Sequence, residues 1–516
     1  MKNKYELRIL HTSDTHGYIY PQSYSTQKAM NIGIAKLNTL IKSLRTTNTL
    51  LIDSGDTIQG SPLMYHHSKD NVEAVNPMAK VMNFMKYDYI TIGNHEFNYG
   101  LQYLNGFLKN VKSKILNCNI LDTNSHKPFI GITHDIINIT DGPKIGIIGV
   151  TTHYIPNWEQ PSHLENLIIK DAFTSLNDLV SIVKPQVDFL IVNYHGGFER
   201  DFKTFSLNVE DTGENQGSKM LKEIDGIDLL LTGHQHRMLS GKLYDTYYSQ
   251  PGFNAQHLAK IDITFTFNSS WNAEISGELI GTNDVIADSD ILELVEESEQ
   301  ATQLYLDTPV GILDKDFLIT DQLHARLHKH ELISLINQIQ LDYTNADIAL
   351  CGLGNDVSGF RKEITIRDII GTYIYPNTLV VKEMSGKDII RAIEKTAEFF
   401  TLKDGEIAIS DQYSTPKLQL YAYDMYDGIE YTLKIGNKVG ERVIDITKDG
   451  KPFDLDKKYS VCMNNYRSSG GGDYLFIKDC KIINDTQTEI MELLINYIVK
   501  TKEIKINHKD NIKIIK

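Results

Sequence analysis

The first half of the chain repeats one pattern, in which a short apolar segment is followed by a polar turn and then by a stretch with helical spacing. Leu7–Leu10 and Leu50–Ile52 are predicted strands, and Ile34–Leu44 has the spacing of an amphipathic helix. Near-continuous apolar strands that alternate with helices are typical of a sheet covered on both faces. We therefore expect an α/β fold, with residues 1–285 forming a layered domain of mixed strands.

Five of the polar turns contain residue types that bind metals. These turns are Ser13–Gly17, Asp53–Asp56, Gly93–Glu96, Tyr194–Gly197 and Thr232–His236. In an open α/β sheet, ligand sites collect at the carboxyl ends of the strands, where loops from several strands converge. We therefore expect the five turns to face a common cleft.

Seven side chains in these turns can offer an oxygen or a nitrogen to a metal ion, namely Asp14, His16, Asp56, Asn94, His195, His234 and His236. Carboxylate, imidazole and amide together suit Mn, Zn, Fe, Co or Ni better than Ca. A carboxylate can bridge two cations, and such a pair clamps the attacking and leaving oxygens of a phosphoryl transfer. Glycines such as Gly55 and Gly93 allow tight turns beside these ligands. We predict a phosphoesterase with two divalent metal ions of undetermined identity.

In this order, the turns resemble the signature of the calcineurin-like metallophosphoesterases. The resemblance implies a layered β-sandwich flanked by helices. It implies one metal ion held by Asp14, His16, Asp56 and His236, and a second held by Asp56, Asn94, His195 and His234. It further implies that a metal-bound hydroxide attacks phosphorus in line, and that His95 is the catalytic histidine that stabilises the transition state and protonates the leaving oxygen.

A change of character separates the two halves of the chain. The acidic segment Asp288–Glu299 has a capping start and helical spacing, so we place a connecting helix or hinge at residues 286–307. Residues 308–516 then form a second domain. Its Lys-rich tail, Lys500–Lys516, is predicted to be a peripheral strand with a frayed end.

Four segments of the second half resemble the C-terminal domain of bacterial nucleotidases, namely Tyr373–Leu379, Asp424–Gly428, Asn464–Arg467 and Gly470–Asp473. The resemblance implies a smaller α+β domain that binds the nucleoside. Tyr375 and Tyr466 would stack on the two faces of the base, which any base tolerates. Asn377 and Asp473 would hydrogen-bond the base and ribose, and Arg326 aligns with a phosphate-binding arginine.

Within this family, Gly93–Gly100 and the Tyr-Pro-Asn-Thr segment most resemble the 2′,3′-cyclic-nucleotide 2′-phosphodiesterase/3′-nucleotidase branch. The 5′-nucleotidase branch usually has Asp in place of Asn98, and that Asp raises the basicity of the catalytic histidine. It also has a Gly-Gly-Gly-x-Arg turn, which Gly352–Asp356 lacks. We therefore predict hydrolysis of 2′,3′-cyclic nucleotides and 3′-nucleotides to nucleoside and phosphate.

Two alternatives remain. A 5′-nucleotidase or UDP-sugar/nucleotide diphosphatase would use the same metal ions with another substrate register. A non-catalytic nucleotide-binding protein belongs to a different class, and the loss of a metal ligand or of His95 would have favoured it; none is lost.

Composition limits the partners and the compartment. A formal net charge of −15 argues against nucleic acid polymers and anionic membranes as partners. Four widely spaced cysteines suit a reducing compartment. The sequence shows no signal peptide and no apolar run long enough to span a bilayer, so we expect a cytoplasmic protein. The oligomeric state is left open.

Overall fold

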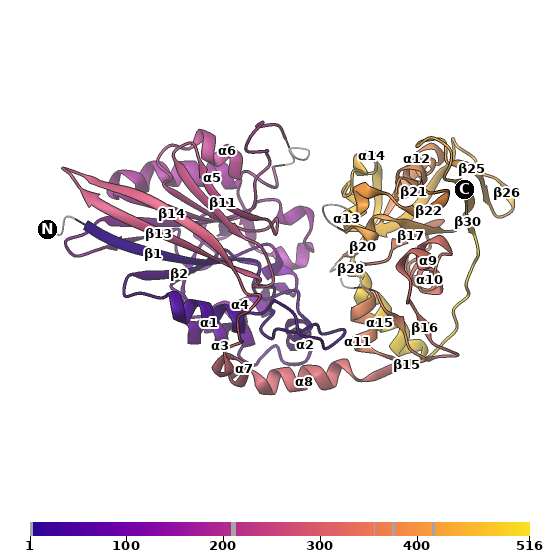
Figure 1. The fold of residues 1–516 in the computed structure, drawn as a ribbon, viewed down its shortest axis with the longest axis horizontal. Helices are drawn as coiled ribbons and strands as arrows, with labels where there is room; N and C mark the ends of the chain where they lie inside the picture. The colour runs from indigo at the N-terminus through magenta and orange to yellow at the C-terminus, as the bar shows by residue number, and fades with distance from the viewer. Residues whose placement is uncertain (1–3, 208–212, 356, 374–376, 415–417) are drawn as a thin grey trace. The chain divides into compact units, whose positions relative to one another are not determined.

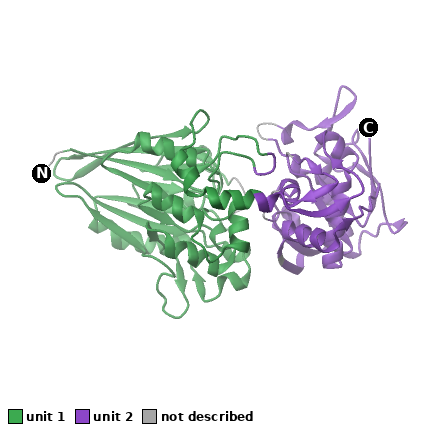
Figure 2. Ribbon diagram, turned by 90° about the horizontal axis from the view of Figure 1, so that it is seen from below, with its two compact units in different colours: residues 1–23, 27–303 green, residues 24–26, 304–516 purple. Residues whose placement is uncertain are grey.

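The computed structural model describes residues 4–207, 213–355, 357–373, 377–414 and 418–516, without the side chain of Gln487. The chain forms two compact units (Figure 2). Unit 1 contains residues 1–23 and 27–303, and unit 2 contains residues 24–26 and 304–516. The predicted domains 1–285 and 308–516 remain predictions beside this division.

Unit 1 is built on two six-stranded sheets. The first has the order β14 (Trp271–Gly281), β13 (His257–Phe267), β1 (Lys4–Thr12), β2 (Thr49–Asp53), β3 (Tyr89–Thr91), β4 (Lys114–Leu116). The second has the order β11 (Met238–Leu243), β12 (Thr246–Pro251), β10 (Leu229–Thr232), β9 (Phe189–His195), β7 (Lys144–Thr151), β6 (His134–Asn138).

Both sheets are mixed, as predicted. In the first, β1 pairs in parallel with β2 and antiparallel with β13, so the start of the chain lies beside strands that come some 250 residues later (Figure 1). In the second, β7, β9 and β10 run parallel, and the edge strands β6 and β11 run antiparallel to their neighbours. Because each sheet contains antiparallel strand pairs, neither sheet is purely parallel.

The two sheets pack face to face around a buried apolar core. Ile9 and Ile52 of the first sheet meet Ile147, Ile191 and Leu231 of the second. The other face of the second sheet is covered by α5 (Ala172–Val183) and α6 (Gly217–Glu223), which supply a second apolar cluster. Burial on both faces explains why the strands of this sheet are almost uniformly apolar. The predicted layered β-sandwich with flanking helices is confirmed.

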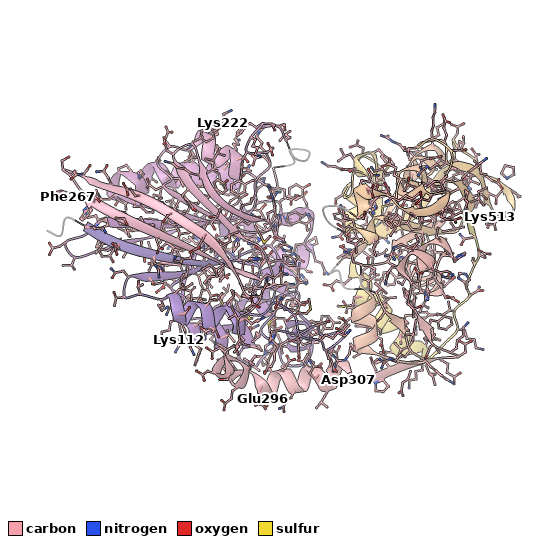
Figure 3. The ribbon with its side chains drawn as sticks, viewed as in Figure 1. Lys112, Lys222, Phe267, Glu296, Asp307 and Lys513 are labelled. Atoms are coloured by element: carbon pink, nitrogen blue, oxygen red, sulfur yellow. The ribbon has the colours of Figure 1, made fainter. Side chains whose placement is uncertain are left out.

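The acidic segment between the halves forms two helices rather than one. Asp288 caps α7 (Ser289–Leu294) by accepting a hydrogen bond from the backbone of Asp290, and α8 follows from Glu296 to Leu306. The break falls at Val295, whose side chain is buried in unit 1. Figure 3 labels Glu296, the first residue of α8, and Asp307, the residue that follows its end. The boundary between the units falls inside α8, after residue 303.

Unit 2 is a smaller α+β unit, as predicted. Its central sheet has the order β23 (Asp424–Asp427), β17 (Ile348–Gly352), β27 (Lys458–Asn464), β20 (Thr378–Ser385), β28 (Lys481–Glu489). Two longer helices, α10 (Glu331–Thr344) and α12 (Gly386–Ala397), belong to this unit. The tail is not frayed, because β30 (Ile512–Ile515) pairs in parallel with β24 (Glu430–Lys434).

None of the helices in the described ranges combines the length and the apolar character that crossing a membrane requires.

Candidate metal centre

Each predicted metal ligand lies at or just beyond the carboxyl end of a strand of unit 1. In the first sheet Asp14 follows β1, Asp56 follows β2 and Asn94 follows β3. In the second sheet His195 ends β9, and His234 follows β10. The ends of the two sheets therefore bring together turns that are more than 200 residues apart in sequence.

Asp14, His16 and His236 form the first group that can hold a metal ion. The Nε2 atoms of His16 and His236 are 2.9 Å apart, and His236 Nε2 is 3.5 Å from Asp14 Oδ1. His16 Nδ1 lies 2.9 Å from the carbonyl oxygen of Gln59, which can only accept, so this nitrogen carries the proton. The lone pair of Nε2 is thereby left for a metal ion. Burial, and then the charge of His236, lowers the pKa of His16 to about 4, which keeps the ring neutral.

Asp56, His195 and His234 form the second group. Asn94 completes it, because its Oδ1 lies 3.0 Å from His195 Nε2 and 2.9 Å from His234 Nδ1. His195 Nδ1 donates to the carbonyl oxygen of Ser54 at 2.7 Å, which leaves Nε2 as the ligand atom. The convergence of these atoms on one point is the geometry that a bound cation requires.

The charges and the burial of these side chains favour the binding of cations. Asp56 Oδ2 is buried and accepts no hydrogen bond from the part of the chain that the structure describes, although His195 Nε2 lies 3.1 Å away. Burial alone would raise the pKa of Asp56, but His195 and His95 outweigh it and hold that pKa well below its usual range. Conversely, burial would lower the pKa of His195, yet Asp56 and its neighbours raise it to about 10. A divalent cation would supply the positive charge that these buried carboxylates demand, and would displace that proton.

The ligand turns are held in unusual backbone conformations. Five of the seven ligands have positive φ angles, between 50° and 73°, namely Asp14, His16, Asp56, His234 and His236. This region is costly for residues other than glycine, and such strain concentrates at functional sites. The turns brace each other, since the backbone N–H of Asp14 donates to Gly55 and that of His16 donates to Asp56. A Cβ atom at Gly93 would stand 2.2 Å from Asp56 Oδ1, so only glycine fits there.

Two carboxylates support the centre without having been predicted as site residues. Glu96 is buried and accepts backbone N–H groups of Asp56, Thr57 and Gly93 at 2.5 to 2.9 Å, which fixes the turn that carries Asp56. Glu214 lies 2.8 Å from His234 Nε2, the nitrogen that faces away from Asn94. Glu96 stands two residues after Asn94, so its motif offered a signal. Glu214 lies 20 residues before its partner, in a segment without a motif.

His95 lies beside the metal groups, where the resemblance implies the catalytic histidine. Its backbone N–H donates to Asp56 Oδ1 at 2.8 Å, and its ring centroid is 5.3 Å from that of His16. Its Nδ1 lies 2.6 Å from Asn98 Oδ1. The side chain is only partly buried.

Unit 2 contains the predicted nucleoside-binding residues. Tyr466, in α13 (Asn465–Ser468), is 44% exposed and packs over Gly471, where a Cβ atom would stand 2.5 Å from the ring. Asp473 is exposed, with a φ of 67°. Asn377 is half-buried directly before β20. Tyr375 lies outside the described residues.

A buried ion pair between Arg467 and Asp424 supports the turn that carries Tyr466. Arg467 Nε lies 2.7 Å from Asp424 Oδ2, and both side chains are almost completely buried. Arg467 also donates to the carbonyl oxygen of Gly471 and stacks on the Tyr474 ring at 4.0 Å. This pair fixes α13 against β23 while leaving the Tyr466 ring exposed.

Arg326 has a structural role, so the prediction that it binds substrate is wrong. Its side chain is completely buried. Its five N–H donors are all used, on the carbonyl oxygens of Gln322, Leu353, Gly354 and Leu420 and on the side chain of Gln322. An arginine that ties loops together in this way has no donor left for a phosphate.

Comparison with known proteins agrees with this geometry. Residues 7–238 match the calcineurin-like phosphoesterase family, and residues 309–479 match the 5′-nucleotidase C-terminal domain. A solved structure of a candidate 5′-nucleotidase from Staphylococcus aureus, in complex with α-ketoglutarate, is 32% identical with a TM-score of 0.83. The match covers 99% of this chain and 100% of that one. The chain belongs to this two-domain phosphoesterase family. Its members hydrolyse phosphoric esters with divalent metal ions, and the predicted family is confirmed.

Two further relatives are each 25% identical to this chain. A 2′,3′-cyclic-nucleotide 2′-phosphodiesterase/3′-nucleotidase from Haemophilus influenzae is 25% identical over 97% of this chain and 86% of that protein. The trifunctional nucleotide phosphoesterase protein YfkN from Bacillus subtilis is also 25% identical, over 96% of this chain. The phosphoesterase spans only 38% of the length of that larger protein.

Proposed function

We propose that the chain hydrolyses 2′,3′-cyclic nucleotides and 3′-nucleotides to nucleoside and phosphate. The observation that carries the proposal is the pair of metal-binding groups, Asp14–His16–His236 and Asp56–His195–His234. We assign the seven predicted ligands to two sites, with Asp56 bridging and Asn94 in the second site. Asp56 Oδ2 is buried and accepts no hydrogen bond from the described residues, which supports that bridging role.

The chemistry follows from these groups. Two divalent cations, when bound, supply a nucleophile at neutral pH and neutralise charge on the phosphate. The residues of the chain position the reaction: the carbonyl oxygens of Gln59 and Ser54 orient His16 and His195. His95 Nε2 then gives a proton to the leaving oxygen of the nucleoside.

In unit 2, we assign Tyr466 as a stacking surface for the base, with Asn377 and Asp473 as hydrogen-bonding partners of base and ribose. The ring of Tyr466 is exposed, and the buried ion pair of Arg467 and Asp424 holds the helix that carries it, which supports this assignment. Tyr375, which lies outside the described residues, remains the proposed second ring of the stacking pair.

A second candidate function has its own support. The 32% identical relative from Staphylococcus aureus is described as a candidate 5′-nucleotidase, so a 5′-nucleotidase or UDP-sugar/nucleotide diphosphatase is the main alternative. A nucleotide-binding protein without catalysis is the alternative of another class, and the retention of all seven ligands and of His95 argues against it.

A substrate panel combined with metal analysis tests the proposal. We expect purified protein to turn over 2′,3′-cyclic AMP and 3′-AMP faster than 5′-AMP or a UDP-sugar, with two metal ions bound per chain. Dominant turnover of 5′-AMP would overturn the substrate assignment. His95→Asn should lower kcat on the order of 10²- to 10⁴-fold with unchanged metal content, because it removes the general acid. No turnover of any substrate by the metal-loaded protein would favour the binding protein.

The compartment and partners are proposals as well. We propose a cytoplasmic location without nucleic acid or membrane partners. The four cysteines are free, with Cys351 and Cys462 buried, as suits a reducing compartment. Cell fractionation tests the location, and enrichment in a secreted or cell-wall fraction would contradict it.

A further inference from the structure

Asn98 joins the predicted catalytic histidine to a buried carboxylate. Its Oδ1 lies 2.6 Å from His95 Nδ1, and its Nδ2 donates to Glu159 Oε2 at 2.6 Å. Glu159 follows the short helix Ile155–Asn157 after β7, whereas His95 and Asn98 follow β3 of the other sheet. We propose that Glu159 is a positioning residue that fixes the ring of His95 in its Nδ1–H form through Asn98.

The direction of each hydrogen bond follows from Glu159. A carboxylate only accepts, and Glu159 Oε1 already receives the backbone N–H of Gln160 at 2.9 Å and His163 Nδ1 at 2.8 Å. The amide of Asn98 must therefore turn its NH₂ group toward Oε2 of Glu159. That orientation presents the Asn98 oxygen to His95, and an oxygen acceptor requires a proton on His95 Nδ1.

The consequence concerns the other nitrogen of the ring. The backbone N–H of His95 is fixed on Asp56 Oδ1 at 2.8 Å, and Nδ1 is fixed on Asn98. His95 Nε2 is then the nitrogen that exchanges a proton with the substrate, as the proposed function requires of it. With Nδ1 keeping its proton on Asn98, the proton that His95 gives to the leaving oxygen is the one on Nε2 of the doubly protonated ring, and the Nδ1–H tautomer remains after the transfer.

In this arrangement the Glu159 carboxylate contacts Asn98 and not His95 itself, so one side chain separates the acidic group from the ring. The amide of Asn98 passes on orientation but cannot pass on a proton. Glu159 is 7% exposed and receives three N–H donors, so its place is built into the fold. A carboxylate that only held its own loop would not need the bond to Asn98.

Three variants test the chain of hydrogen bonds. In Glu159→Gln, the new amide keeps its oxygen on the Gln160 N–H and turns its NH₂ toward Asn98, so Asn98 rotates and presents NH₂ to His95. Asn98→Asp sets two carboxylates against each other. In the double variant Asn98→Asp/Glu159→Gln, the carboxylate introduced at position 98 accepts from both His95 and the new glutamine, and the original direction returns.

The measurement is the tautomer of His95, read from ¹⁵N–¹H correlation spectra of full-length, ¹⁵N-histidine-labelled, Zn²⁺-loaded protein at a pH that keeps the ring neutral. His95→Asn identifies its signals. We expect Nδ1–H in the original protein, Nε2–H in Glu159→Gln, and Nδ1–H again in the double variant. In parallel, kcat should fall on the order of 10²-fold in Glu159→Gln and return to within about tenfold in the double variant, with KM and zinc content unchanged.

The controls separate this role from a merely structural one. Glu165→Gln changes an exposed carboxylate of the same segment and should leave both readouts unchanged. Retention of Nδ1–H in Glu159→Gln, or failure of the double variant to restore it, would overturn the proposal. If Glu159→Gln does not fold, Asn98→Leu tests the same bond and should shift His95 to Nε2–H. Because the spectra require no turnover, they decide the role of Glu159 even if His95 is not catalytic.

Discussion

The two candidate sites are built in different ways. In unit 1 the candidate metal ligands are mostly buried, come from five turns, and include five strained backbone positions. In unit 2 the candidate nucleoside-binding residues Tyr466 and Asp473 are exposed, and the buried groups Arg467 and Asp424 lie beneath them. Metal-assisted chemistry needs donor atoms fixed to a fraction of an ångström, whereas base stacking needs an open, firmly supported ring.

The largest effect should follow from removing the proposed bridging ligand. Asp56→Ala should lower bound metal to less than one ion per chain and reduce kcat/KM on the order of 10³-fold or more, since the cations supply several kcal/mol of transition-state stabilisation. Metal content by mass spectrometry and turnover of 3′-AMP check this. Asp245→Ala, at an exposed turn, is the control. Full retention of two metal ions would exclude the bridge.

Breaking the support in unit 2 should change stability rather than metal binding. Arg467→Ala leaves the Asp424 carboxylate buried without its partner, which costs about 3–5 kcal/mol of unfolding free energy. Urea unfolding curves measure the loss. The double variant Arg467→Met/Asp424→Leu should recover most of it, because no buried charge remains. An equal loss in both variants would show that packing, and not charge, dominates at this position.

Removing the stacking ring should affect substrate binding alone. Tyr466→Ala should raise KM about 5- to 150-fold, corresponding to about 1–3 kcal/mol of stacking, and Tyr466→Phe should change it little. Steady-state kinetics on 3′-AMP and 3′-CMP measure both. An unchanged KM in Tyr466→Ala would show that the ring does not bind the substrate, and the contrast between the two candidate sites would then fail.

A smaller effect is expected from the carboxylate behind His234. Glu214→Gln should weaken one of the two metal sites about 10- to 100-fold, because partners of metal-ligating histidines orient the ring and raise its basicity. Calorimetric titration of the metal-free protein with Mn²⁺ separates the two sites. Glu223→Gln, an exposed carboxylate of α6, should leave both affinities unchanged. Equal weakening of both sites would argue for a general electrostatic effect.

Much of unit 1 could be predicted because its information is local. Apolar runs encode the strands, and the polar residue directly after each run must lie at the sheet edge. Asp14, Asp56 and His195 were therefore identifiable from their places in the sequence. Glu96 lies in one of these turns, so its motif offered a signal, whereas Glu214 lies in a segment without a motif and is defined only by its contact with His234.

In unit 2 the same reasoning was less effective. Arg326 aligns with a phosphate-binding residue, yet its guanidinium is buried against backbone carbonyls. The peripheral strand expected in the tail is present as Ile512–Ile515 at the edge of a sheet, but its pairing with β24, which keeps the end from fraying, could not be predicted. Exposure and strand pairing depend on neighbours that are distant in sequence, so sequence position alone does not give them.

By itself, the sequence determined the α/β class and the residue types of the candidate metal centre, because these follow from periodicity and from turns directly after strands. The family came from the resemblance of those turns to a known signature. Only the tertiary structure decided how the donor atoms of the seven side chains converge. It also decided which nitrogen of His16 and His195 is free, and that Asn98 donates a hydrogen bond to Glu159. The reason is physical. Local patterns arise between neighbours in the chain, whereas hydrogen-bond direction and burial arise between segments that packing alone brings together.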